Sequence, residues 1–251
     1  MLTDSHCHLN YLDEPTEALT FARQRGVSTF LCIGVDEKGI AAVLSMAENH
    51  VDVYATVGEH PGAATGAPQW IEPLINHPKV VALGEMGLDY YYETDDSVRR
   101  RQMDSFRQQM AMAETNGLPV VIHTREAKQD TLDVLRDHPR VTGVLHCFTE
   151  DWDMAAQAIE MGYFISISGI VTFKQADNVR QVAQQVPLQR LLIETDSPWL
   201  APVPHRGKQN QPGYVADTAA FLAELRGEDL NRLAEQTSEN FRLLFGLSAA
   251  Q

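Results

Sequence analysis

The length, composition and charge of the chain limit the classes of protein to which it can belong. Its 251 residues suffice for one large core and match the size of a closed α/β barrel, so we expect a single domain over residues 1–251. Apolar residues make up 44% and charged residues 22%, which excludes an extensively disordered chain. The net charge of −14 opposes nonspecific attraction to a polyanion. It does not exclude a nucleic-acid substrate, because bound divalent cations act at contact.

Neither a membrane span nor a secretion signal is expected. No stretch approaches the roughly 18 uncharged apolar residues of a membrane helix, and the start MLTDSHCHLN lacks a basic segment and an apolar signal core. The cysteines Cys7, Cys32 and Cys147 are odd in number and lack CxxC spacing, which favours reduced thiols. We therefore expect a cytoplasmic, monomeric protein that has no membrane partner.

Short apolar runs rich in Val, Ile and Leu alternate with amphipathic segments along the whole chain. This pattern is typical of buried parallel strands that alternate with helices. In chain order, the predicted elements are strand Leu2–His6, helix Pro15–Arg25, strand Thr29–Ile33, helix Lys38–Asn49, strand Val53–Val57, strand Val80–Gly84, helix Arg99–Asn116, strand Pro119–His123, helix Ala127–Asp137, strand Gly143–His146, helix Trp152–Met161, strand Tyr163–Ser168, helix Ala176–Gln185, strand Leu191–Thr195, and helices Val215–Arg226 and Asp229–Leu244.

Eight such strands in about 250 residues favour a (β/α)8 TIM barrel, although an open doubly wound sheet has a similar local pattern. The polar residues discriminate between the two folds. In a barrel, active groups gather at the C-terminal ends of the strands, and this chain places its unusual polar residues there. The sequence therefore predicts a barrel whose active site lies at that face.

Two histidines stand on the first predicted strand. His6 and His8 are two residues apart, so their side chains point to the same face and can converge on one ion. Taken alone, a His-x-His pair is weak evidence, because polar packing at a strand end explains it as well.

Four further potential ligands follow buried runs. Glu85 ends VVALGE, His123 ends LPVVIH, His146 ends GVLH and Asp196 follows LLIET. Each alone could be a helix cap, a hydrogen-bonded strand end or a salt-bridge partner, but the set is difficult to explain in this way. Imidazole nitrogens and carboxylate oxygens suit Mg, Mn or Zn, and six such ligands suit two divalent ions that share a carboxylate.

We therefore predict a two-metal centre at these six positions. Glu85 is expected to bridge, with His6, His8 and Asp196 on one ion and His123 and His146 on the other. Asp196 is the expected acceptor of the proton from an activated water.

Five ordered motifs carry a family resemblance. They are DSHCHLN at 4–10, GEMGLDY at 84–90, PVVIHTRE at 119–126, LHCF at 145–148 and LLIETDSP at 191–198. The chain resembles the TatD family of metal-dependent hydrolases, within the amidohydrolase-like barrels, and is most similar to its bacterial YcfH-like branch. The resemblance implies a (β/α)8 fold, divalent metal at the six positions and hydrolysis, commonly of DNA by 3′ to 5′ exonuclease action.

The sequence departs from the family pattern at three places outside the predicted ligands. GEHPG at 58–62 has one histidine where many members carry a second, NQP at 210–212 replaces a common NEP, and Gln129 replaces a usual acidic residue. These differences bear on the substrate and not on the metal centre.

Candidate substrate contacts surround the predicted centre. The resemblance makes His60 a phosphate or leaving-group contact, although an exposed loop histidine would look the same. Arg125 could clamp a phosphate in a bidentate manner, or neutralise nearby acids. Glu194 could face the barrel mouth or pair with a buried arginine. His205, Arg206 and Lys208 form a basic cluster in the loop 201–214 that suits an anionic substrate, although such charges are often only solvated.

Three consecutive tyrosines, Tyr90, Tyr91 and Tyr92, are candidate stacking platforms for bases, although at least one is expected in the core.

Three functions remain open from the sequence. The first is a phosphodiesterase that trims DNA, single-stranded or at 3′ ends, because divalent ions, Arg125 and the basic loop suit phosphate. The second is a two-metal hydrolase of an amide or aminoacyl ester, since the same centre polarises carbonyls. The third is a metal-binding module without turnover, which Asp196 disfavours because a structural site has no use for a carboxylate base.

Overall fold

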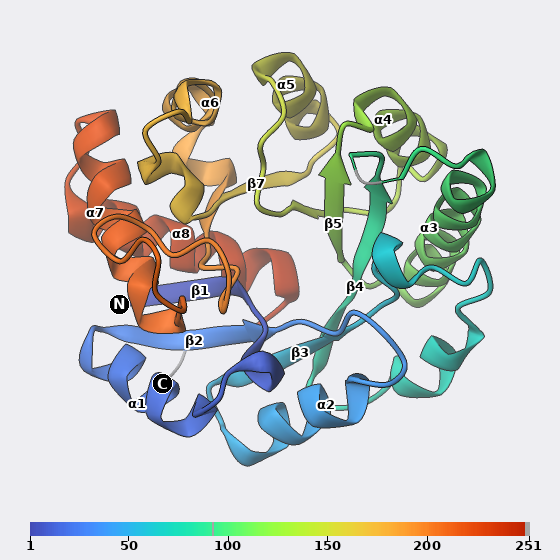
Figure 1. The fold of residues 1–251 in the computed structure, drawn as a ribbon, viewed down its shortest axis with the longest axis horizontal. Helices are drawn as coiled ribbons and strands as arrows, with labels where there is room; N and C mark the ends of the chain where they lie inside the picture. Colours follow the sequence, from blue (N-terminus) through green and yellow to red (C-terminus); the bar gives the residue numbers. More distant parts are fainter. Residues whose placement is uncertain (92, 249–251) are drawn as a thin grey trace.

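Within the described residues, 1–91 and 93–248, the computed structural model has eight strands in one parallel sheet. Each strand pairs with the next in the order β1 to β8, and Figure 1 shows the strands as a ring surrounded by helices. The predicted (β/α)8 barrel is confirmed. The strands are β1 (Leu2–Cys7), β2 (Val27–Cys32), β3 (Val53–Val57), β4 (Val80–Asp89), β5 (Val120–Arg125), β6 (Gly143–Leu145), β7 (Phe164–Ile167) and β8 (Leu191–Ile193).

The helices follow the strands and cover the outside of the ring. Short 3-10 helices, η1 (Leu9–Tyr11), η2 (Pro61–Ala63), η3 (Gln69–Leu74), η4 (Gly169–Thr172), η5 (Leu188–Arg190) and η6 (Pro212–Tyr214), lie in the connections. The α-helices are α1 (Pro15–Gln24), α2 (Ile40–Asn49), α3 (Asp96–Asn116), α4 (Lys128–Asp137), α5 (Trp152–Glu160), α6 (Asp177–Gln185), α7 (Val215–Arg226) and α8 (Leu230–Phe245).

Helix α3 starts earlier than the sequence predicts. It begins at Asp96 rather than Arg99, because the side chain of Asp95 accepts a hydrogen bond from the backbone N–H of Ser97 and caps the first turn. Its end at Gly117 matches the prediction, since this glycine adopts the left-handed conformation of a helix C-cap, with a φ of 64°.

The ring closes between β1 and β8 through backbone hydrogen bonds rather than a long ladder. The N–H of His8 donates to the carbonyl of Ser197 at 2.8 Å, and the N–H of Asp196 donates to the carbonyl of His6 at 2.9 Å. Closure therefore brings the first strand and the segment after the last strand together at His6, His8 and Asp196, three of the predicted metal ligands.

Strand β4 is longer than predicted, and this changes the position of Glu85. The prediction ended the strand at Gly84, but the strand continues to Asp89 with an irregular register between Leu83 and Met86. Such a bulge turns a side chain away from the regular alternation of a strand. Glu85 therefore lies in the middle of β4 and not at its end.

Two glycines permit this path of β4. Gly84 and Gly87 both have a φ of 137°, a region that side chains disfavour. A Cβ on Gly84 would lie 2.5 Å from the carbonyl oxygen of Val121, and one on Gly87 would overlap the carbonyl oxygen of His123. The two glycines of the GEMG sequence thus allow β4 to pack closely against β5.

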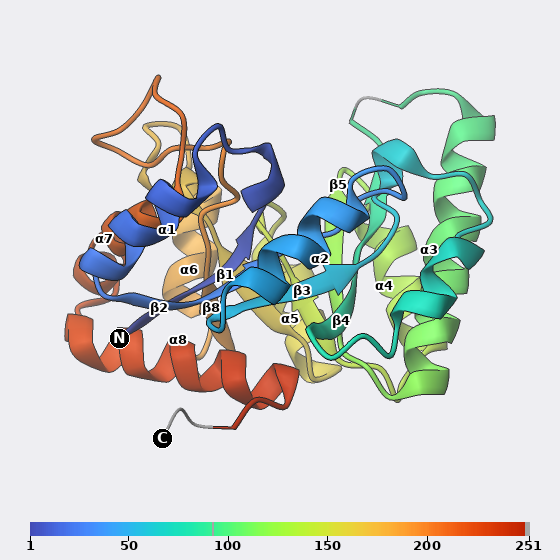
Figure 2. The same cartoon turned by 90° about the horizontal axis from the view of Figure 1, so that it is seen from below.

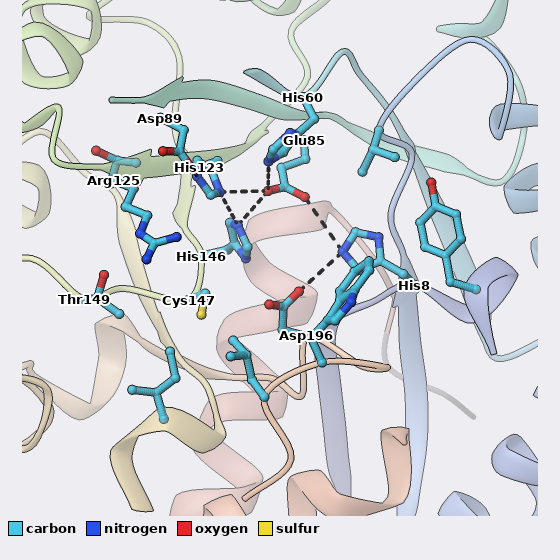
Figure 3. A pocket seen from close by; sticks show the side chains of 16 residues that line it. His8, His60, Glu85, Asp89, His123, Arg125, His146, Cys147, Thr149 and Asp196 are labelled. Carbon is cyan, nitrogen blue, oxygen red and sulfur yellow. Dashed lines mark hydrogen bonds and ion pairs between the residues drawn. The ribbon is translucent and has the colours of Figure 1, made fainter. Parts of the chain in front are cut away.

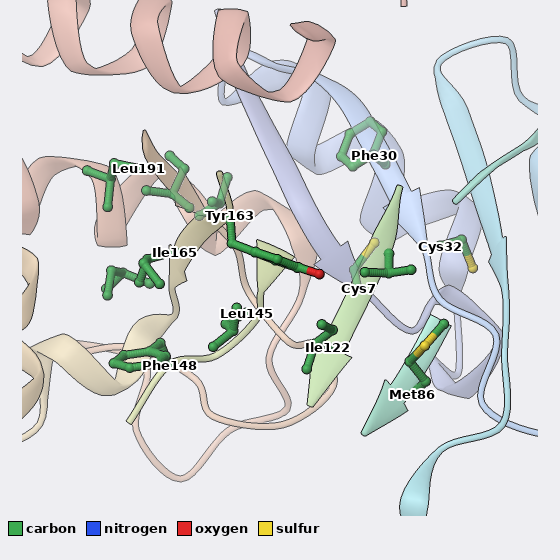
Figure 4. Close-up of a cluster of buried hydrophobic side chains, with 14 of the residues drawn as sticks. Cys7, Phe30, Cys32, Met86, Ile122, Leu145, Phe148, Tyr163, Ile165 and Leu191 are labelled. Atoms are coloured by element: carbon green, nitrogen blue, oxygen red, sulfur yellow. The ribbon is translucent and has the colours of Figure 1, made fainter. Parts of the chain in front are cut away.

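Apolar residues form two clusters on the two faces of the barrel wall. One cluster lies between the strands and the helices, and Figure 4 shows part of it around Tyr163. The other includes Val121 and Val144, which are two residues before His123 and His146 on β5 and β6 and so share the interior face with them. Phe241 of α8 belongs to this interior cluster. Figure 2 shows α8 along one end of the barrel.

Two further expectations can be compared with the structure. Cys7, Cys32 and Cys147 are all free thiols, as predicted. No helix among residues 1–91 and 93–248 is long and apolar enough to cross a membrane.

The closed end of the barrel yields a stability prediction. Replacing Phe241, which is fully buried, with Ala removes the floor of the interior cluster and should lower the free energy of unfolding by about 3–5 kcal/mol. Leu243→Ala on the same helix is the matched control, because Leu243 is 71% exposed, and should change it by about 0.5 kcal/mol or less. Urea denaturation followed by circular dichroism measures both. Equal losses would contradict the placement of Phe241 in the barrel floor.

Candidate metal centre

A cavity opens at the C-terminal ends of the strands, where the sequence places its polar residues. Its volume is about 800 Å³, within the range of small-molecule sites. Figure 3 shows that side chains from the ends of many strands converge in it. Its walls include the predicted ligands His8, Glu85, His123, His146 and Asp196.

The buried carboxylate of Glu85 is the centre of this arrangement. Its Oε1 lies 2.9 Å from Nε2 of His146 and 3.1 Å from Nδ1 of His123. Its Oε2 faces the other way, at 3.4 Å from Nε2 of His6 and 3.9 Å from Nε2 of His8. The two oxygens of one carboxylate thus face two different pairs of histidines, as Figure 3 shows in part.

Asp196 completes the group on the side of β1. Its Oδ1 lies 3.4 Å from Nε2 of His8 and 3.7 Å from Nε2 of His6. Asp196 has a left-handed φ of 57°, so the chain has left the extended conformation of β8 by this residue. Its side chain is 15% exposed, and it therefore borders the cavity.

A buried acid behind the wall holds this segment in place. Asp4 of β1 is fully buried, and its carboxylate accepts hydrogen bonds from the N–H of Thr195 at 2.8 Å and from its hydroxyl at 2.6 Å. Burial raises the pKa of Asp4 well above its usual value, although the bonds from Thr195 oppose that shift. Asp4 thereby ties β1 to the segment that carries Asp196.

Two carboxylates hold histidine rings from behind. Oε1 of Glu194 lies 3.3 Å from Nδ1 of His146, and Oδ2 of Asp89 lies 3.1 Å from Nε2 of His123. Each carboxylate can accept a hydrogen bond from the ring nitrogen that it faces, and with a metal bound the other nitrogen would present its lone pair to the centre. Pairs of this kind orient metal-binding histidines in proteins.

The position of Glu194 corrects the sequence-based expectation. The sequence left two alternatives for Glu194, a substrate contact at the mouth or the partner of a buried arginine. Glu194 is fully buried, does not line the cavity and contacts His146. The strand was predicted to reach Thr195 but ends at Ile193, so Glu194 does not have the orientation of a strand residue. Asp89 was not singled out by the sequence analysis. Its signal is an acidic residue close behind Glu85 in GEMGLD.

His60 lies beside the same centre. Its Nδ1 accepts the N–H of Gly62 at 2.9 Å, so the neutral ring carries its proton on Nε2. That nitrogen is 3.4 Å from Oε1 of Glu85. Burial lowers the pKa of His60 to about 4, which keeps the ring neutral at physiological pH. His60 is thus arranged as a hydrogen-bond donor at the cavity.

The pKa shifts follow from burial and neighbouring charges. Burial would raise the pKa of Glu85, but the imidazoles of His146, His60 and His123 outweigh it and hold that pKa well below its usual range. Burial likewise would raise the pKa of Asp196, and His8 and His6 bring it below its usual value. Both carboxylates are therefore ionised at neutral pH.

These residues fit a divalent metal in donor chemistry and in position. His6, His8 and Glu85 form one group of close donor atoms, and His60, Glu85 and His123 form another, so Glu85 belongs to both. A third group joins His6 and Asp196 to His146. The Nε2 atoms of His6 and His8 lie 3.2 Å apart, and both buried Nδ1 atoms lack a hydrogen-bond partner. Imidazole and carboxylate donors of this mix suit Zn, Mn or Mg.

The remaining predicted contacts lie in different places. Arg125 ends β5, lines the cavity and places its guanidinium 3.7 Å from the ring centre of Tyr91. His205 and Arg206 are outside the cavity wall. His205 stacks on Tyr214 and bonds to Asp217, and Arg206 lies over Phe173 and donates to the carbonyl of Ala201. These two residues anchor their loop, so the basic cluster expected from the sequence does not face the centre.

Comparison with known proteins identifies the family of the chain. Residues 3–246 match the family described as TatD related DNase. The chain belongs to this family.

Relatives span the whole chain. The Escherichia coli protein YcfH, named an uncharacterized metal-dependent hydrolase, is 42% identical over 100% of this chain and 97% of its own length. YabD of Bacillus subtilis, which carries the same description, is 38% identical over 99% of this chain and 100% of its own. The crystal structure of YjjV, a TatD homologue from Escherichia coli, superposes with a TM-score of 0.91 at 31% identity and covers 98% of both chains.

The carboxylate behind His146 provides a test of the centre. Glu194→Gln replaces the charged acceptor with a neutral one, so His146 is oriented less firmly and metal affinity should fall about 10- to 100-fold. Competition with a chromogenic chelator measures the affinity for Zn or Mn. Glu160→Gln is the matched control, because Glu160 is an exposed glutamate at the end of α5. An unchanged affinity in Glu194→Gln would contradict the role of Glu194.

Proposed function

We propose that this metal-dependent hydrolase of the TatD family is a phosphodiesterase that shortens DNA from its 3′ end. The observation that carries the proposal is the carboxylate of Glu85, which faces a different pair of histidines with each oxygen. This arrangement supports a pair of divalent ions with Glu85 between them. The family description supports DNA as the substrate.

His6, His8 and Asp196 would hold one ion and His123 and His146 the other, with Glu85 shared. Bound ions of this kind supply positive charge at the phosphate and lower the pKa of water. The protein supplies the geometry, because Asp89 and Glu194 fix two of the rings from behind. Asp4 fixes the segment of Asp196.

Asp196 is the proposed proton acceptor from the attacking water. It is ionised, and it borders the cavity, so it can reach a water molecule there. Its position next to His8 and His6 keeps the carboxylate oriented towards the centre. This combination of ionisation and access is what a general base requires.

Two residues are proposed to bind the phosphodiester. Arg125 lines the cavity and can donate two parallel hydrogen bonds to phosphate oxygens. His60 carries a proton on Nε2 and can donate it as a hydrogen bond to the leaving oxygen. Glu194, His205 and Arg206 are not part of this proposal, since none of them lines the cavity.

The proposal is tested with an end-labelled single-stranded oligonucleotide. Protein that has been stripped of metal and then supplied with Mg, Mn or Zn should remove nucleotides from the 3′ end. Asp196→Asn removes the proton acceptor and should lower kcat about 100-fold or more, since general-base catalysis contributes 10²- to 10⁴-fold. Product ladders on a denaturing gel measure both.

Two results would count against the proposal. Degradation that is independent of metal would point to a contaminating activity or a different mechanism. If no metal supports shortening, DNA is not the substrate, and amide and aminoacyl ester substrates become the next assays, with the same Asp196→Asn control.

A further inference from the structure

Two large aromatic side chains of the cavity have no part in the chemistry described so far. Trp199 and Tyr11 both line the cavity, and they remain 50% and 41% exposed. Tyr11 ends η1, shortly after β1, and Trp199 follows β8. The closure of the barrel brings them together, with their ring centres 5.7 Å apart. They therefore form a continuous aromatic surface on one side of the mouth.

This aromatic surface lies next to the metal centre. The ring centre of His8 is 5.1 Å from that of Trp199 and 5.9 Å from that of Tyr11. On its other side, His8 approaches Asp196 at 3.4 Å. One imidazole ring thus separates the aromatic surface from the proposed proton acceptor. A substrate group that stacks on this surface would therefore lie next to the bond that is cleaved.

The main chain holds Trp199 in position. Its N–H donates to the carbonyl of Asp196 at 3.0 Å. The side chain of Asn210, which is fully buried, donates to the carbonyl of Trp199 at 2.5 Å and to that of Thr195 at 2.8 Å. A side chain on a fixed backbone loses less freedom when it binds a ligand. The backbone of Trp199 is therefore held in place before a ligand binds.

The chemistry of the surface favours a flat, uncharged and aromatic group. Among the described residues that line the cavity, Arg125 carries the one guanidinium group. The protein as a whole has a net charge of −14. Electrostatic attraction therefore contributes little to the binding of a polyanion away from the ions. Stacking of bases on aromatic rings does not depend on charge and tolerates any base.

The tyrosines that the sequence suggested as stacking platforms are engaged elsewhere. The guanidinium of Arg99 lies over the ring of Tyr90, whose hydroxyl donates to Asp130, and that of Arg125 lies over the ring of Tyr91. Tyr92 lies outside the described residues. In contrast, Trp199 and Tyr11 face the cavity beside His8.

We propose that Trp199 and Tyr11 form the stacking platform for the base of the nucleotide at the cleavage site. The inference rests on the proposed phosphodiesterase function and adds the recognition of the base to it. The platform explains how a strongly acidic protein holds a DNA end without sequence readout, since every base has a flat face. Phosphate and base are then recognised on different sides of the centre, by Arg125 and by Trp199.

The test compares two single-stranded oligonucleotides of equal length. One carries ordinary bases, and the other has base-less tetrahydrofuran residues at its last three positions at the 3′ end. Fluorescence anisotropy with Mn present, on strands whose last linkages at the 3′ end are phosphorothioates that resist cleavage, gives Kd, and assays of ordinary linkages with Mn give KM and kcat. Trp199→Ala should raise Kd and KM for the ordinary strand about 5- to 100-fold with a smaller change in kcat.

The control variants separate stacking from a structural effect. Trp199→Phe retains an aromatic face and should restore most of the affinity. Trp70→Phe, at a tryptophan of η3 outside the cavity, should bind like the parent. For the base-less strand, Trp199→Ala and the parent should have the same Kd.

The outcomes distinguish failure of the stacking platform from failure of the proposed phosphodiesterase function. A parent that shortens DNA while Trp199→Ala has an unchanged Kd overturns the platform and leaves the phosphodiesterase in place. Equal weakening for both strands overturns it as well, because Trp199 would then contact the sugar or phosphate. A parent that neither binds nor shortens the ordinary strand overturns both proposals.

Discussion

The buried carboxylate of Glu85, surrounded by imidazole rings, is the interaction on which the architecture of the site depends. A buried charge costs several kcal/mol unless it is paired and hydrogen-bonded, and here the partners come from separate strands of the barrel. The bulge of β4 turns Glu85 towards them, and closure of the ring supplies His6 and His8 on one side. The acids Asp89 and Glu194 then fix His123 and His146 on the other.

The same strands supply both stability and chemistry, at different heights along the barrel. Val121 and Val144 belong to the apolar floor, and His123 and His146 follow two residues later on the same face. Two residues along each strand thus separate the apolar floor from the candidate metal ligands. This division allows the floor to contain large apolar groups such as Phe241 without restricting the donors above it.

Much of this could be predicted from the sequence, because periodic apolar runs and the polar residues that end them are local features. They identified the barrel, and they selected residues that the structure places around Glu85. The features that were missed depend on the tertiary structure. The bulge that places Glu85 within β4 follows from the register of β4 against β5. Glu194 lies just beyond the end of β8, and its burial depends on the packing around that segment. The attachment of His205 to Asp217 and Tyr214 follows from the packing of a loop on α7 and η6.

The apolar floor formed with α8 determines where ligands enter and leave the cavity. Because one end of the barrel is closed by packed side chains, the cavity has its mouth at the other end, and what enters there must leave by the same route. A polymer strand therefore cannot pass through the barrel from one end to the other. On the proposed exonuclease action, each released fragment would have to leave through this mouth before the next nucleotide could enter.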